Sequence, residues 1–385
     1  MLDSMDVMLY ALVLGQVQKE LHLTPAISGL MMSATLISAA FGGIGFGWFA
    51  DRSGRARALT GSVLVYSLST CLCGFAQTGW QLLIFRILLG FGMGGEWASG
   101  AALVAETWPD HHRGKALALM QSCWAIGYAL GALVVALVMP HFGWRAVFFV
   151  GVAPALITLW LRRRLKEPEI WKREHQARQS FSSLFRGKLG RSMVVCSSMN
   201  AAALFGFWGI FTWSPRFLSM PVAEGGRGLS IRQTSTWTIA MEIGSFLGYL
   251  VFGYLADRFR RKYVYIGFLA IAAVLIPVYA FVENANLLLL IGPLVGFFGT
   301  GYFSGFGVIT SELFPAPLRG SAMGFAYNSG RVVSAAAPYL IGGISERFGL
   351  SYALCITAVG FVLAALIATA LQQPSAFQDF EPRKG

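Results

Sequence analysis

Charged residues are scarce in this sequence. Only 12% of its 385 residues are Asp, Glu, Lys or Arg, against about 25% in an average soluble domain. This scarcity, with 56% hydrophobic residues, excludes a disordered chain and a nucleic-acid-binding chain. The mean hydropathy of +0.61 and the 45 glycines instead indicate a polytopic membrane protein, because glycine lets helices approach closely in lipid.

Residues that could bind a metal or perform enzyme chemistry are also few. No GxSxG, HExxH or paired-cysteine motif occurs in the sequence. The five cysteines lie in apolar stretches and the five histidines lie in loops or at the ends of apolar stretches: Cys71, Cys73, Cys123, Cys196, Cys355, His22, His111, His112, His141 and His175. We therefore expect no disulfide framework, no metal site, no organic cofactor and no enzyme.

Apolar stretches of about 20 residues, the length that crosses ~30 Å of hydrocarbon as a helix, recur along the whole chain. We count twelve: 1–18, 27–50, 58–76, 80–107, 114–139, 145–162, 192–218, 232–255, 263–282, 286–313, 319–344 and 350–371. The polar segment 163–191 divides them six and six. The sequence predicts an all-α membrane protein of two six-helix bundles, 1–162 and 192–371, with a cytoplasmic central loop 163–191 and a cytoplasmic tail 372–385.

Lysine and arginine gather in alternate loops, and basic residues are retained on the cytoplasmic side of a membrane. With both termini cytoplasmic, most of the 30 basic residues fall on that side. The outer side then holds six of them: Lys19, Arg145, Arg216, Arg227, Arg232 and Arg347. This topology explains the net charge of +12, so we expect a lipid bilayer around the chain and no nucleic-acid partner.

The second half of the chain repeats the first at a constant offset of 206 residues, as from Asp51 to Asp257. Other matched pairs include Gly47 and Gly253, Arg52 and Arg258, Glu106 and Glu312, Arg113 and Arg319, and Gly143 and Gly349. Two halves related in parallel are typical of many secondary transporters. The same offset places the start of the first span before Met1, so we expect either a short first span or a protein that begins upstream.

Three stretches resemble the signatures of a known family. The loop GWFADRSGRAR, 47–57, and its second copy GYLADRFRRK, 253–262, resemble the signature loop of the major facilitator superfamily. RILLGFGMGG, 86–95, is similar to the Arg-and-Gly motif of that superfamily. The resemblance covers the whole chain and implies the major facilitator fold, a secondary transporter whose two bundles move around a central site.

Three further stretches resemble the organic-acid/proton symporters of the superfamily, the group of sialate, lactate and aromatic-acid transporters. They are LDSMDVMLY (2–10), GGEWASGAALVAETWP (94–109) and ELFPAPLRG (312–320). Drug antiporters of the superfamily usually carry a Gly-Pro motif in the fifth span, but AIGYALGALV (125–134) contains no proline. The resemblance therefore implies proton-coupled uptake of a small organic anion.

Acidic residues inside the spans are the candidates for proton coupling, because an ionised group at mid-bilayer costs ~2.5–3.5 kcal/mol. Asp3 and Asp6 share a face of the first span, and Glu96 lies deep in the glycine-rich fourth span. We expect Asp6 and Glu96, with Asp3, to bind and release the coupled proton. Two alternatives stay open: Asp3 in the cytoplasmic interface, and Glu96 as a protonated group that only holds helices together.

Arg331, near the middle of the eleventh span, is the candidate that binds the substrate carboxylate, because a guanidinium grips a carboxylate through two parallel hydrogen bonds. Asn328, Gln121 and Glu242 are expected to line the same cavity. The alternative is a structural ion pair between Arg331 and Glu242. For Arg86 the resemblance implies a role in proton movement, whereas its position also permits its side chain to reach the outer interface.

Polar residues of the two signature loops and of the turns after the fourth and tenth spans could form salt bridges that close the cytoplasmic side. These candidate gating residues are Gly47, Asp51, Arg52, Arg55, Arg113, Asp257, Arg258 and Arg319. The alternative is that the arginines only set topology.

Together these features predict a monomeric inner-membrane transporter that imports a small organic acid with protons. A neutral-sugar importer or a drug/proton antiporter is the alternative within transport. A non-transporting membrane receptor is a remote alternative, because no loop is long enough to form a soluble domain.

Overall fold

A computed structural model describes residues 1–107, 110–153, 155–157 and 184–371. Within these ranges, the side chains of residues 51, 55, 97–107, 110–118, 311, 316, 317, 319 and 320 are also outside the described part. No strand occurs in the described residues. The fold is all-α, as the sequence predicts.

The helices follow the expected spans closely. They are α1 (Leu2–Leu21), α2 (Pro25–Ser53), α3 (Arg55–Gly74), α4 (Gly79–Thr107), α5 (Asp110–Val150), α8 (Gly187–Ser219), α9 (Ile231–Arg258), α10 (Arg261–Phe281), α11 (Ala285–Gly301), α12 (Phe303–Leu313), α13 (Ala316–Ser334), α14 (Ala336–Phe348) and α15 (Leu350–Thr369). Eight helical stretches among the described residues are long and apolar enough to cross a membrane.

Two expected spans differ from a single straight helix. The fifth and the start of the sixth share the label α5, but Gly143 is non-helical, with φ of 75° and ψ of 177°, and separates them as the sequence predicts. The tenth divides into α11 and α12 at Tyr302, and the eleventh into α13 and α14 at Ala335. The last break lies one turn after Arg331, so the helix that carries this candidate is discontinuous close to it.

Local sequence explains where several helices begin and turn. Thr24 caps α2 by accepting a hydrogen bond from the Ile27 amide, with Pro25 at the first helical position. Ser230 and Gln233 form a capping box at the start of α9. Gly143 and Gly349, which the sequence repeat matches, have φ of 75° and 82°. Both halves therefore turn the same corner with a glycine in a conformation that other residues rarely adopt.

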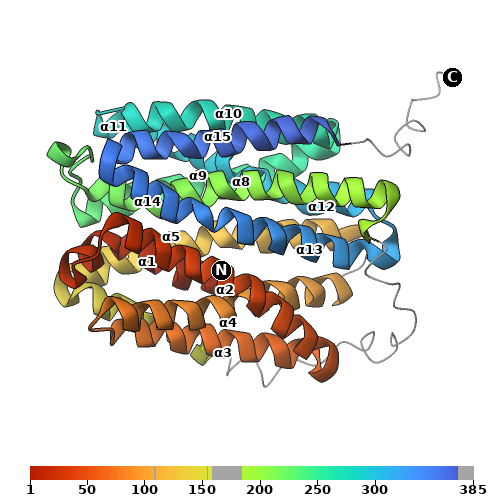
Figure 1. Cartoon of the computed structure of the whole chain (residues 1–385), viewed down its shortest axis with the longest axis horizontal. Coiled ribbons are helices and arrows are strands. Elements are labelled where there is room, and N and C mark those ends of the chain that lie inside the picture. The colour runs from red at the N-terminus through yellow and green to blue at the C-terminus, as the bar shows by residue number, and fades with distance from the viewer. Residues whose placement is uncertain (108–109, 154, 158–183, 372–385) are drawn as a thin grey trace.

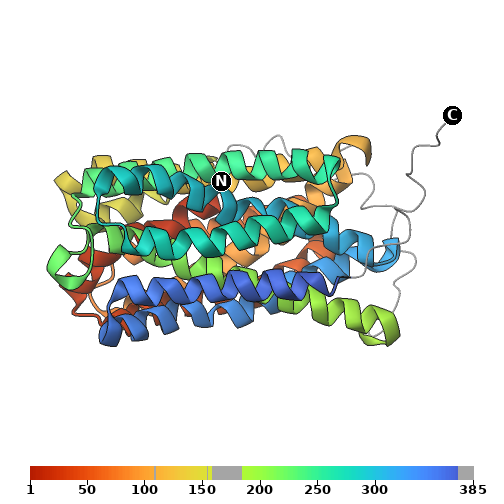
Figure 2. The ribbon, with the colours of Figure 1, turned by 90° about the horizontal axis from the view of Figure 1, so that it is seen from above.

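The helices form two bodies that lie side by side (Figure 1). Helices α2–α4 lie at one side of the view and α10, α11 and α15 at the other, with α1, α5, α8 and α13 between them. The two bodies meet where α5 packs on α9, α2 on α14 and α1 on α8. Figure 2 shows the same long, parallel arrangement from above. Residues between the bodies are therefore contributed by both halves of the sequence.

Helix α1 has 20 residues, and its first turn lies near the middle of the long axis (Figure 1). The Ser4 hydroxyl donates to the Trp124 carbonyl of α5 at 2.9 Å. The first turn of α1, with Asp3, is therefore buried inside the bundle.

Glycines let α2 and α4 touch backbone to backbone. A Cβ atom added at Gly42 would lie 1.9 Å from the Phe91 carbonyl oxygen, and one at Gly94 would lie 1.9 Å from the Ala39 carbonyl oxygen. No side chain fits at either contact. This close approach brings Glu96 of α4 into the interior of the first bundle.

We expect Gly94→Ala to destabilise the protein, because the added methyl group must push α2 and α4 apart. Overpacking of this kind costs about 1–3 kcal/mol. The measurement is the melting temperature of the detergent-purified protein, which should fall by several degrees. Gly267→Ala in α10 is the matched control, since nothing lies within 4 Å of its added Cβ atom. Equal melting temperatures for both variants would contradict this account of the α2–α4 contact.

Candidate functional site

Three carboxyl groups gather inside the first bundle. Asp6 is fully buried, and its Oδ2 accepts a hydrogen bond from the Thr70 hydroxyl of α3 at 3.2 Å. Asp3 is 8% exposed, and both Glu96 and Asp3 lie within electrostatic range of Asp6. The structure therefore brings together the three residues that the sequence selects as proton carriers, and it places Asp3 in the interior rather than at the cytoplasmic interface.

These carboxyl groups have few polar partners. Asp6 Oδ1 and Glu96 Oε2 are buried without a hydrogen-bond partner in the described part of the chain. The Tyr66 side chain lies beside Glu96, and the amino group of Met1 lies 3.4 Å from Asp3 Oδ1. No Lys or Arg side chain among the described residues forms an ion pair with any of the three. An ionised carboxylate in such surroundings is costly, because it has left water without gaining a cation.

Arg86 faces the interior of the same bundle. It is fully buried, its guanidinium lies 4.3 Å from the centre of the Tyr10 ring, and it donates to the Val7 carbonyl at 3.4 Å. The expectation that Arg86 could reach the outer interface is therefore wrong, because Tyr10 and Met32 hold it between α1 and α2. Sequence depth alone did not show which way the side chain turns.

Arg331 is buried in the second half without an acidic partner in the described part of the structure. It is 3% exposed, and its Nη2 donates to the Tyr327 hydroxyl at 3.3 Å. The guanidinium lies 4.8 Å from the centre of the Tyr327 ring, and Nε has no partner. No ion pair joins Arg331 to Glu242. The alternative in which these two residues neutralise each other is therefore absent from this conformation.

Glu242 lies on α9 where α5 packs against it. It is 2% exposed, its Oε1 has no partner in the described structure, and Tyr128 of α5 is within electrostatic range. Tyr249, two turns further along α9, interacts with Gln121 of α5. The structure thus places two predicted lining residues, Glu242 and Gln121, at the contact between the halves.

Asn328 faces the first half rather than Arg331. Its amide donates to the Gly324 carbonyl at 3.0 Å, and its Oδ1 lies 3.3 Å from a Cβ atom added at Gly43 of α2. Asn200 of α8 donates to the carbonyls of Ala326 and Tyr327 at 3.2 and 3.3 Å. Asn200 therefore anchors the helix that presents Arg331, a role that no sequence motif indicated.

Aromatic side chains from both halves form a continuous cluster beside these polar groups. Trp124 of α5 contacts Phe207 of α8 with ring centres 6.5 Å apart, and Phe207 contacts Phe303 of α12 at 5.0 Å. Tyr249 lies 6.5 Å from Phe303. The region between the halves therefore has flat apolar walls beside the buried Glu242.

Polar contacts join the halves at the predicted outer end. Arg216 of α8 donates from Nε to Gln18 of α1 at 2.9 Å, and Glu346 of α14 accepts from the Ala26 amide at the start of α2 at 2.9 Å. The Glu346 carboxylate also meets the positive end of the α2 dipole. We call these two contacts the outer latch.

A third polar contact at this end lies within the first half. Arg145 forms an ion pair with Glu20, and the Trp144 indole donates to the same carboxylate. The hydrogen bonds from Arg145 and Trp144 hold the pKa of Glu20 below its ordinary value.

The candidate gating residues are only partly described. The side chains of Asp51, Arg55, Arg113 and Arg319 lie outside the described residues. Beside Gly47 an added Cβ atom would meet nothing within 4 Å. The described charged side chains, Arg52, Asp257 and Arg258, are exposed, with Arg52 over the Trp48 ring and Arg258 near the Tyr254 hydroxyl.

Sequence reasoning missed Arg261, which forms an ion pair with Glu312 and lies 4.0 Å from Asp257. The signal was available, because Arg261 is the repeat counterpart of the candidate Arg55 at the offset of 206. All three residues belong to the second half. This network ties α9, α10 and α12 together and does not itself join the two halves.

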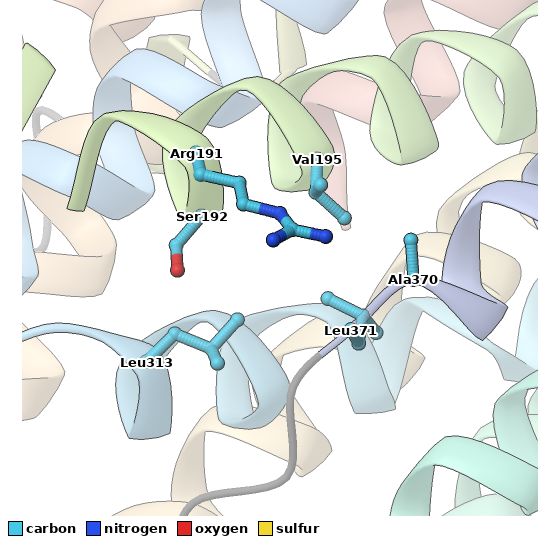
Figure 3. A pocket seen from close by; sticks show the side chains of 6 residues that line it. All are labelled: Arg191, Ser192, Val195, Leu313, Ala370 and Leu371. Carbon is cyan, nitrogen blue, oxygen red and sulfur yellow. The ribbon is translucent and has the colours of Figure 1, made fainter. Parts of the chain in front are cut away.

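A small pocket opens at the predicted cytoplasmic end of the second half (Figure 3). It is lined by Arg191, Ser192, Val195, Leu313, Ala370 and Leu371, and the Arg191 guanidinium extends across it. None of the predicted site residues lines it. Because the second half alone forms this pocket, it does not have the position of a site between the halves.

Comparison with known proteins decides the family. The family model described as "Major Facilitator Superfamily" matches residues 1–226 and 217–384. The chain belongs to the major facilitator superfamily. A probable 4-methylmuconolactone transporter of Cupriavidus pinatubonensis is 36% identical over 379 residues, covering 95% of this chain and 87% of that relative.

Other members of the superfamily agree in function class and in fold. A cis,cis-muconate transport protein of Acinetobacter baylyi is 28% identical, covering 95% of this chain and 90% of that relative. The crystal structure of a D-xylose-proton symporter matches with a TM-score of 0.78 at 17% identity, over 97% of this chain and 95% of that chain. This chain is therefore a membrane transporter and not an enzyme, as its sequence predicts.

Loss of the outer latch should move this transporter toward an outward-open conformation. We expect the double variant Arg216→Ala/Glu346→Ala to lose roughly 1 kcal/mol per hydrogen bond, which gives about a five-fold population change for each contact. The measurement is the distance distribution between spin labels at Phe142→Cys and Val222→Cys, two exposed positions in different halves at the predicted outer end, with the native cysteines replaced.

Arg347→Ala is the matched control for this measurement, because Arg347 is exposed and adjacent to Glu346. The control should keep the short distance of the parent protein. If the double variant also keeps the parent distribution, the outer latch does not hold the halves together.

Proposed function

We propose that this chain is a proton-coupled importer of a small organic acid that works by alternating access. The cell location that fits its bacterial relatives is the inner membrane, with both termini cytoplasmic. One chain contributes both halves of the site, so a monomer suffices. The coupling ion is a proton, and no other cofactor enters the proposal.

The observation that carries this proposal is the buried guanidinium of Arg331. It has a hydrogen bond to Tyr327 but no acidic partner in the described structure, and its Nε is unsatisfied. A buried cation without an anion is costly. A substrate carboxylate bound between the halves would supply the missing charge and the missing acceptors. Relatives that are named as transporters of cis,cis-muconate, niacin and sialic acid support the same substrate class.

Proton coupling is supported by the carboxyl cluster of Asp3, Asp6 and Glu96. Ionising neighbouring buried carboxyl groups together is unfavourable. The cluster should therefore bind a proton when the transporter closes and water no longer reaches these groups. Arg86 lies in the same bundle without an acidic partner in the described residues.

The two centres would act in sequence. Protons from outside neutralise the cluster, the acid binds Arg331 near Gln121 and Glu242, and the outer latch forms as the halves close. Opening toward the cytoplasm then releases both. The proposed gate on that side comprises the signature-loop residues, with the Arg261–Glu312 pair stiffening the second half.

Acid-driven proton uptake into proteoliposomes tests this function. A panel of lactate, sialate, benzoate and hexonates is added to the outside while an internal dye reports pH. We expect protein-dependent acidification with at least one acid and its loss in Glu96→Gln, because an amide cannot carry the proton. Arg331→Ala should also abolish it, because the carboxylate loses its binding partner.

The proton-uptake experiment needs two controls. Protein-free liposomes measure the leak of uncharged acids, and Glu283→Gln changes an exposed loop carboxylate that should not affect uptake. A folded wild-type protein that is silent across the panel would contradict organic-acid transport and direct attention to neutral sugars or drugs. Uptake that persists in Glu96→Gln with its proton flux intact would remove the cluster from the coupling mechanism.

A further inference from the structure

Glu242, like Arg331, is a buried ionisable residue, and it lies where the two halves pack together. Its side chain is 2% exposed, and Oε1 has no hydrogen-bond partner in the described structure. No Lys, Arg or His among the described residues forms an ion pair with it. A helix that only packs against its neighbour would be more stable with an apolar side chain here.

The surroundings of Glu242 belong to the same region as Arg331. Tyr249 lies seven residues after Glu242, on the same face of α9, and it is within electrostatic range of both Glu242 and Tyr327. Tyr327 in turn accepts the hydrogen bond from Arg331. The two tyrosines therefore link an unsatisfied acceptor on α9 to an unsatisfied donor on α13.

The groups that face Glu242 do not satisfy its free oxygen. The Tyr128 hydroxyl, which approaches from α5, donates instead to the Phe211 carbonyl of α8 at 3.0 Å. The Ser245 hydroxyl of α9 interacts with the Glu242 carboxyl group and also lies 3.2 Å from the Met241 carbonyl. Oε1 nevertheless has no hydrogen-bond partner among the described residues, so it remains available to a donor from an occupant of the site.

We propose that Glu242 determines substrate specificity by accepting a hydrogen bond from a hydroxyl group of the acid whose carboxylate binds Arg331. The inference rests on the proposed organic-acid transport. The substrate class is then a hydroxy acid, with its carboxylate toward α13 and its hydroxyl toward α9. The aromatic cluster of Trp124, Phe207, Phe303 and Tyr249 favours a flat body between these two ends.

Matched pairs of acids test this assignment. Uptake of benzoate is compared with uptake of 3- and 4-hydroxybenzoate, and propionate is compared with lactate, in the same proteoliposomes. The wild-type protein should prefer the hydroxylated member of at least one pair by about ten-fold or more, because a site built to bind a hydroxyl is left with an unpaired group by the analogue. Glu242→Met should reduce this preference to near one by slowing uptake of the hydroxy acid.

Two further variants make the result decisive. Glu242→Gln keeps an acceptor oxygen and the side-chain shape, so it should show an intermediate preference for the hydroxylated acid. This variant also tests the role of Glu242 if Glu242→Met does not fold. Ile243→Met places the same new side chain at the adjacent, 57% exposed position of α9 and should keep the wild-type preference.

The outcomes separate this inference from the proposed function. No protein-dependent uptake of any acid would overturn the transport proposal itself. Uptake without a hydroxyl preference in the wild type, or an equal loss for both members of a pair in the Glu242 variants, would overturn the specificity role and leave organic-acid transport intact.

Discussion

A guanidinium buried in the second half, without an acidic partner in the described structure, is the constraint on which the account depends. Several features hold Arg331 in place: the Tyr327 ring beside it, the Asn200 amide that grips the backbone of α13, and the helix break at Ala335 one turn away. These contacts orient the cation without neutralising it. The guanidinium therefore still lacks an anion, which a substrate carboxylate between the halves would supply.

The two halves share their scaffold but not their charged residues. Gly143 and Gly349 turn equivalent corners in the two halves, so the scaffold is shared. The chemical groups are not, since the counterpart of Arg331 is Ala125 and the counterpart of Glu96 is Tyr302, at the offset of 206. The carboxyl cluster therefore belongs to the first half and the lone guanidinium to the second. Rocking of one half against the other can then couple a proton in one bundle to an anion at the surface of the other.

The sequence predicted the all-α fold, the superfamily and the burial of Asp6, because hydropathy and the matched motifs depend on local patterns. It could not predict side-chain direction. Arg86 turns inward beside Tyr10, Asn328 faces Gly43 of the other half, and Glu242 stays apart from Arg331. Each outcome depends on how helices distant in the chain pack together. Arg261 is different, since the repeat offset from Arg55 already marked it.

Equilibrium binding to the purified protein tests the central claim about Arg331 most directly. Trp124 and Trp208 lie in contact between the halves, so their fluorescence can be titrated with the acid that proves to be the best substrate. The account predicts a saturable signal that disappears in Arg331→Gln and persists in Glu96→Gln, because the role proposed for the cluster is to carry the proton and not the anion. Unchanged affinity in Arg331→Gln would contradict the account.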